Sequence, residues 1–153
     1  GPRTFAPQKE GRIHIQRSYW NAAPIKAVET PFFVDKYLGN FFHIGHIVHA
    51  FPTARIVHAH RDLRAVAWSM FRQRFADGQI SFGYNPDDII AFVDTYCDLM
   101  RLWSSRFADR ISPLRYATLT QDPETPVLHL TPMLVLPFEK GCLAPHKLWR
   151  MVS

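Results

Sequence analysis

Two polar side chains near the middle of the chain, Arg61 and Ser69, are spaced so that they could hold one phosphate group. Arg61 follows a short stretch that predicts a strand, and Ser69 lies eight residues later on a predicted helix, on the same face as Arg72 and the small Ala65. A guanidinium presents a fork of donors to an anion and a hydroxyl adds one more. The same spacing also fits an ordinary solvated helix face preceded by a surface arginine, and both interpretations stay open.

Lys36 is the second candidate for chemistry. It follows the apolar run PFFV at 31–34, which predicts a buried strand, so we expect Lys36 at the carboxyl end of that strand. A lysine there could stabilise charge that develops on an oxygen bridging two phosphoryl or sulfuryl groups. The alternative is a surface lysine at a strand end.

The elements that must position these residues follow from the periodicity of the apolar side chains. Apolar positions from 40 to 51 predict a helix that Pro52 ends, and RIVHAH at 55–60 predicts a second strand. From Leu63 to Phe71 the apolar residues recur at helical spacing and predict an amphipathic helix.

The second half of the chain predicts further helices and one more strand. Asn85-Pro86-Asp87-Asp88 is a strong start for a long helix, and a third strand is predicted at about 114–119. A helix that starts at 122–124 is expected to be short or broken, since prolines 126 and 132 lie within it. This order predicts an α/β fold with a short parallel sheet flanked by helices.

Composition sets the broad class of the protein. The 153 residues, 47% of them hydrophobic, predict a single domain (1–153), with a poorly defined N-terminal segment at 1–30 that holds at most one short helix. The net charge of +5 favours an anionic ligand, and no apolar run is long enough to span a membrane. The two isolated cysteines favour a reducing compartment, so we expect a cytoplasmic protein. Because the chain starts at Gly1 and not at Met, we expect a fragment of a longer protein.

Three other functions receive little support from the residues. HRDL at 60–63 matches the start of the protein-kinase catalytic loop, but Ala67 stands where that loop has a metal-binding Asn, and Asp-Phe-Gly is absent. A metal site is conceivable on histidines 43, 46 and 49 or on histidines 58 and 60, but no acidic residue accompanies them at ligand spacing, so we expect no metal. The basic residues are dispersed, which argues against nucleic acid as a partner.

Residues 30–152 carry five short elements in the order of a known enzyme family. They are VDK at 34–36 with Asn40, FPTARI at 51–56, RDLRAVAWSM at 61–70, RY at 115–116 with DPE at 122–124, and LPFE at 136–139 with CL at 142–143. In these elements the chain resembles bacterial sulfotransferases related to tyrosylprotein sulfotransferases. Those enzymes use 3'-phosphoadenylyl sulfate (PAPS) and have a three-layer fold like that of P-loop kinases.

The resemblance implies a role for four residues. Arg61 and Ser69 would hold the 3'-phosphate of PAPS, Tyr116 would contact the same end of the nucleotide, and Lys36 would act in catalysis on the bridging oxygen. The implied reaction transfers a sulfuryl group from PAPS to a hydroxyl acceptor, protein tyrosine among the candidates, and requires no metal.

The sequence also departs from the family in ways that affect activity. The family's Gly-rich loop for the 5'-phosphosulfate, and the general base that follows it, are absent from residues 1–35, and Ala117 replaces the Glu that follows the tyrosine. We therefore expect the C-terminal portion of a sulfotransferase that is inactive by itself. The alternative is a non-catalytic module that binds an anion or nucleotide and retains the fold.

Overall fold

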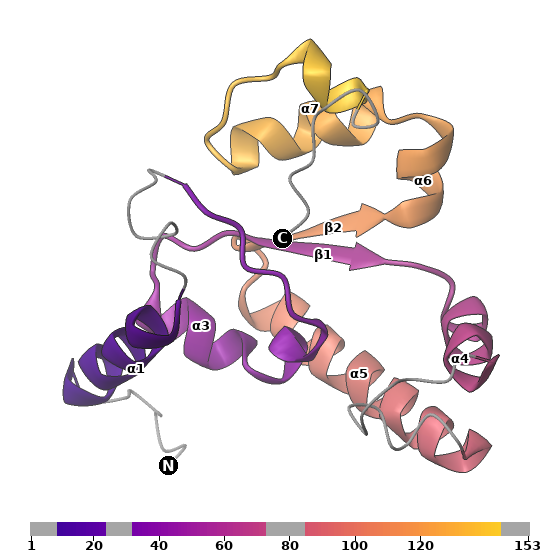
Figure 1. The fold of residues 1–153 in the computed structure, drawn as a ribbon, viewed down its shortest axis with the longest axis horizontal. Coiled ribbons are helices and arrows are strands. Elements are labelled where there is room, and N and C mark those ends of the chain that lie inside the picture. The colour runs from indigo at the N-terminus through magenta and orange to yellow at the C-terminus, as the bar shows by residue number, and fades with distance from the viewer. Residues whose placement is uncertain (1–8, 24–31, 73–84, 145–153) are drawn as a thin grey trace. The chain divides into compact units, whose positions relative to one another are not determined.

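The computed structural model describes residues 9–23, 32–72 and 85–144 (Figure 1). Contacts divide the chain into two compact units, Gly1–Ala54 and Arg55–Ser153. The second unit holds the sheet, and the two units are described separately below.

The first unit is helical. It contains α1 (Lys9–Ala22), the 3-10 helix η1 (Leu38–Phe42) and α3 (Ile44–Ala50), and α1 packs against α3. The buried side chains of this unit are Phe41, Ile44 and Ala50. The predicted helix at 40–51 is therefore present in two parts that meet at His43, and it ends just before Pro52 as expected.

The predicted strand at 31–34 is wrong. Residues 32–37 have no regular secondary structure and all are exposed, with the side chain of Val34 91% exposed, and residue 31 lies outside the described residues. Within the described part of the chain no strand pairs with this run, and a strand needs such a partner for its backbone groups. The ring of Phe33 instead packs against the rings of Tyr19 and Trp20 on α1.

The second unit contains a two-stranded parallel sheet and four α-helices among its described residues. Its elements are β1 (Ile56–His60), α4 (Leu63–Arg72), α5 (Pro86–Arg106), β2 (Ile111–Arg115), α6 (Tyr116–Gln121), α7 (Glu124–Met133) and the 3-10 helix η4 (Lys140–Leu143). β1 pairs with β2 in register from Ile56 opposite Ile111 to His60 opposite Arg115. The α/β class with a short parallel sheet flanked by helices is thus confirmed, and the larger three-layer arrangement stays a prediction.

The helices of this unit cover one another and the sheet. α4 packs against α5, and α6 and α7 pack beside β2 (Figure 1). The buried apolar side chains are Ile89 and Met100 of α5 and Ile111 of β2, and Thr131 of α7 is also buried. This packing fixes α4, the helix that follows β1, against the longest helix of the chain.

The third predicted strand, at about 114–119, overlaps β2 only at residues 114 and 115. β2 begins at Ile111 and contains Pro113, and residues 116–119 lie in helix α6, so the prediction is wrong for them. The backbone N–H of Ile56 donates to the carbonyl of Arg110. In a parallel ladder alternate residues face the partner, so the backbone groups of Ser112 and Leu114 face β1 and those of Pro113 face away. A proline that faces away from the ladder costs no sheet hydrogen bond, so β2 tolerates it as an edge strand.

Side chains at the helix starts explain why the helical predictions succeed. The Asn85 side chain accepts the backbone N–H of Asp87, and Pro86 occupies the first turn of α5, as predicted. The Asp122 carboxylate accepts the backbone N–H groups of Glu124 and Thr125, and its pKa lies below the usual value because Thr125 also donates from its side chain. α7 runs for ten residues without a break, so the expected break is wrong. Pro126 lies in the first turn, where its missing N–H costs nothing, whereas Pro132 lies inside the helix and costs the hydrogen bond to the Leu128 carbonyl.

Candidate functional site

The carboxyl end of the sheet positions two of the predicted residues. β1 ends at His60 and β2 ends at Arg115, and these two residues are paired in register. Arg61 and Tyr116 are therefore the first residues beyond the sheet on neighbouring strands. In open parallel sheets this edge is where ligands bind.

A cap fixes the turn that carries Arg61. The Asp62 carboxylate accepts the backbone N–H of Ala65 at 2.9 Å, and the carbonyl of Asp62 accepts the N–H of Val66. Asp62 thereby satisfies donors in the first turn of α4 and sets the direction in which the chain leaves β1. Arg61 is held between a paired strand and a capped helix, and its side chain is exposed.

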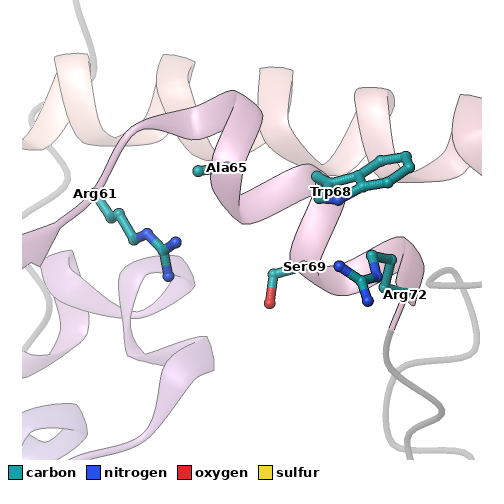
Figure 2. A pocket seen from close by; sticks show the side chains of 5 residues that line it. All are labelled: Arg61, Ala65, Trp68, Ser69 and Arg72. Carbon is teal, nitrogen blue, oxygen red and sulfur yellow. The ribbon is translucent and has the colours of Figure 1, made fainter.

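Arg61 and Ser69 line the same open hollow, whose volume is about 460 Å³. The other lining residues are Ala65, Trp68 and Arg72. Four of the five lie on α4 at positions i, i+3, i+4 and i+7, which is the spacing of one helix face. Figure 2 shows the guanidinium of Arg61 and the hydroxyl of Ser69 directed into the same space. The predicted pair is thus brought together.

The lining of this hollow is basic. Its described residues supply two guanidiniums and no carboxylate. The ion pair found within the described part of the chain joins Arg101 to Asp98 on α5, at 2.8 Å. Neither Arg61 nor Arg72 has an acidic partner among the described residues, so the hollow attracts an anion.

Tyr116 lies at the same sheet edge but outside the lining of this hollow. It is the first residue of α6, and its side chain is 53% exposed. Its ring is therefore available to a ligand that extends along the edge of the sheet.

Lys36 lies in the first unit, in the irregular segment 32–37, and not at a strand end as predicted. Its side chain is exposed, as is that of its neighbour Tyr37. The preceding residue is held in place, because the hydroxyl of Tyr19 on α1 donates to the Asp35 carboxylate at 3.1 Å. Burial and this hydrogen bond raise the pKa of Tyr19 to about 12.

The sequence analysis did not single out Trp68, which lines the hollow. The indole projects from α4 with 61% of its surface exposed, and its ring lies 6.2 Å from that of Phe71. The spacing of Trp68, three residues after Ala65 and one before Ser69, places it on the same helix face. A tryptophan on an amphipathic helix is, however, usually assigned to the apolar face.

The histidines of β1 form a pair on one face of the strand. The rings of His58 and His60 lie 5.2 Å apart, and the Nε2 of His58 shares a short hydrogen bond with the hydroxyl of Tyr96 on α5. Burial, and secondly the neighbouring His60, lower the pKa of His58. Across residues 9–23, 32–72 and 85–144, no cluster of three or more metal-ligating side chains occurs.

A second, smaller hollow of about 290 Å³ lies between β2, α6 and α7. Its polar lining includes one guanidinium, from Arg115, together with the imidazole of His129. It is thus less basic than the hollow on α4. Among the helices that the structure describes, none has the length and apolar character needed to cross a membrane.

Comparison with known proteins shows the family to which the chain is similar. The model of the sulfotransferase family matches residues 5–140 of the chain. An uncharacterized protein of Aquifex aeolicus (strain VF5) is 32% identical over 127 residues, which is 82% of this chain and 17% of that relative, so the chain spans a small part of the relative's length. No solved structure matches the chain. The family match extends over nearly all of the described residues, and the chain belongs to the sulfotransferase family.

Proposed function

We propose that this chain carries the nucleotide-binding side of an enzyme that transfers a sulfuryl group from PAPS to a hydroxyl acceptor. The observation that carries the proposal is the shared hollow of Arg61 and Ser69, two donors on a basic surface to which the described residues contribute no carboxylate. In the proposed complex both side chains bind the 3'-phosphate. The Arg61 fork donates to two phosphate oxygens and the Ser69 hydroxyl donates to a third.

Tyr116 contacts the same end of the nucleotide in this proposal. The support is its place directly after β2, next to Arg61 at the edge of a parallel sheet. An exposed phenol at this edge offers a ring face and a hydroxyl to the sugar or the base.

The proposed reaction forms a bond between the acceptor oxygen and the sulfur of PAPS. The bond between that sulfur and the oxygen of the 5'-phosphate breaks, and adenosine 3',5'-bisphosphate leaves with the bonding electrons. The acceptor proton goes to a general base. The ammonium of Lys36 stabilises the charge that develops on the bridging oxygen, as electrostatic catalysis requires. The acceptor is a hydroxyl compound, with protein tyrosine as the first candidate.

Residues 1–153 alone are expected to bind the nucleotide without turning it over. The Gly-rich loop and the base that the resemblance requires are absent from residues 1–35, and Ala117 stands in place of a glutamate. The prolines of α7 no longer count against the parent fold, because that helix forms. A binding module without catalysis remains the second candidate function, and Ala117 is the residue that favours it.

Calorimetric titration of adenosine 3',5'-bisphosphate into residues 1–153 tests the assigned roles. Arg61→Ala and Ser69→Ala should each weaken binding by roughly 1.5–3 kcal/mol, the usual value of a hydrogen bond to a charged group. Matched controls are Arg64→Ala on the same helix and Ser104→Ala on α5, both exposed and outside the hollow. Equal affinities for all five proteins would refute the assignment.

Turnover separates the enzyme from the binding module. With labelled PAPS and a tyrosine peptide, a sugar or a small alcohol, residues 1–153 should release no sulfated product. A longer protein that supplies the Gly-rich loop and base should do so, and Lys36→Ala should abolish most of that activity. Turnover by residues 1–153 alone would overturn the expected inactivity, and unchanged turnover in Lys36→Ala would remove Lys36 from the mechanism.

A further inference from the structure

Arg72 and Trp68 share the hollow with Arg61 and Ser69, and the proposed function uses neither of them. Figure 2 shows the guanidinium of Arg72 on the Ser69 side of α4, with Ser69 between the two arginines. Both guanidiniums therefore face one hollow from which described carboxylates are absent. Two like charges at one opening repel each other unless an anion lies between them.

The doubled charge bears on the kind of anion that the hollow accepts. A phosphomonoester carries close to two negative charges at neutral pH, whereas a sulfate ester or a carboxylate carries one. A pair of guanidiniums around one hydroxyl matches the larger charge and offers donors to all three terminal oxygens. A single arginine and a serine would hold a monoanion nearly as well.

Trp68 adds an apolar wall to this basic opening. Its indole is 61% exposed, although a tryptophan on an amphipathic helix usually packs inward. Its ring contacts Phe71, which holds the indole in position beside the hollow. Ala65 contributes only a methyl group to the lining, so space remains for a ligand that is larger than an ion.

We infer that Arg72 is a second guanidinium on the anion held by Arg61 and Ser69, and that Trp68 is the stacking surface for a planar ring joined to that anion. The hollow thus takes a dianionic phosphomonoester carried on a nucleoside, and binds it in preference to free phosphate. This inference rests on the proposed function and assigns two further residues to the same site.

Calorimetry with two probes, adenosine 3',5'-bisphosphate and inorganic phosphate, tests the inference. Arg72→Gln should weaken the bisphosphate by about tenfold or more, the usual effect of losing a charge-assisted contact, and Arg64→Gln on the same helix should not. Trp68→Ala should weaken the bisphosphate by about fivefold or more and leave inorganic phosphate unchanged, since only the bisphosphate has a base to stack. Leu102→Ala, an exposed apolar residue of α5 outside the lining, is the control for Trp68.

The possible failures can be told apart. If Arg61→Ala and Ser69→Ala weaken the bisphosphate while Arg72→Gln matches Arg64→Gln, the proposed function stands and the role of Arg72 is refuted. If Trp68→Ala weakens both probes equally, or neither, its stacking role is refuted. If the unaltered chain binds neither probe, the proposed function fails and this inference fails with it.

Discussion

The segment from Arg61 to Arg72 and the segment around Lys36 were both predicted to carry a cation at the end of a strand, and only the first does so. Arg61 follows a paired strand and precedes a helix capped by Asp62. Lys36 lies in residues 32–37, which have no regular structure and only exposed side chains. Both predictions interpreted a short apolar run as a strand and placed the following cation at its carboxyl end. The different outcomes show which further signal such a prediction requires.

The strand prediction that succeeded is the one in which a clear helical pattern follows the apolar run. The apolar run at 31–34 has four residues and no periodic element follows it directly, so its pattern fits a strand and an exposed loop equally well. RIVHAH at 55–60 is followed by ten residues of helical periodicity, and β1 and α4 form in that order. The position of Arg61 is fixed by the strand before it and the helix after it, whereas no regular element directly precedes Lys36.

Filling the hollow on α4 should give the largest effect. Ala65→Leu places a branched side chain between Arg61 and Ser69, and we expect affinity for adenosine 3',5'-bisphosphate to fall by more than about tenfold. Stability should hardly change, because alanine and leucine are both strong helix formers. Calorimetry and thermal melts measure the two quantities.

Two controls sharpen this contrast. Ala91→Leu, at an exposed position of α5, should leave affinity unchanged. Lys36→Ala should also leave it unchanged, because the bisphosphate has no sulfuryl group for Lys36 to act on. An unaltered affinity in Ala65→Leu would mean that the anion binds elsewhere.

A smaller effect is expected on the stability of the second unit when the pH is lowered. The pKa of His58 lies below its usual 6.5, first because the ring is half-buried and second because His60 is near. The unfolded chain therefore takes up a proton at this histidine more readily than the folded chain. The contribution of His58 to the free energy of unfolding is thus fully present above pH 6.5 and decreases as the pH falls below it. Thermal melts between about pH 7 and about pH 5 should show this loss, and His58→Gln should reduce its slope.

The control for the acid effect is His129→Gln, which alters an exposed histidine of α7. Its pH dependence should follow that of the unaltered protein. Identical slopes in His58→Gln and the unaltered protein would show that His58 does not carry the acid sensitivity.

The last prediction concerns the segment around Lys36, at alkaline pH. The pKa of Tyr19 is raised to about 12, by burial first and by the hydrogen bond to Asp35 second. The neutral phenol is thus favoured in the folded unit. The contribution of Tyr19 to the stability of this unit is complete below pH 10 and is lost as the pH rises from 10 to about 12. Asp35→Asn should lower the pKa of Tyr19 only in part, because burial remains.

Absorbance titration of the phenolate measures this shift, with Tyr19→Phe identifying the signal. Asp94→Asn, on the exposed face of α5, should leave the titration unchanged. A Tyr19 pKa that is the same with and without the Asp35 charge would show that the hydrogen bond does not anchor residues 32–37 to α1.

Most of the second unit could be predicted from the sequence, since its elements have local causes. Helical periodicity placed α4, and the Asn85 cap with Pro86 placed the start of α5. The start of β2 was missed because a proline inside a strand is acceptable only at an outward-facing position, and sequence alone does not show which residues face outward. The spacing of Arg61 and Ser69 predicted that the two side chains lie together, and they line one hollow, but their binding role stays a prediction. The exposure of Trp68 could not be predicted, because it depends on how α4 packs against α5.

The proline in β2 has a consequence for how this sheet can grow. Pro113 offers no N–H at the outer edge of β2, so a further strand that paired there would lack one hydrogen bond. The outer edge of β1 differs, because the N–H and C=O groups of Val57 and Ala59 both face outward under the same alternation. A further strand would therefore pair more favourably with β1 than with β2. If that strand ran parallel to β1, its carboxyl end would lie near Arg61.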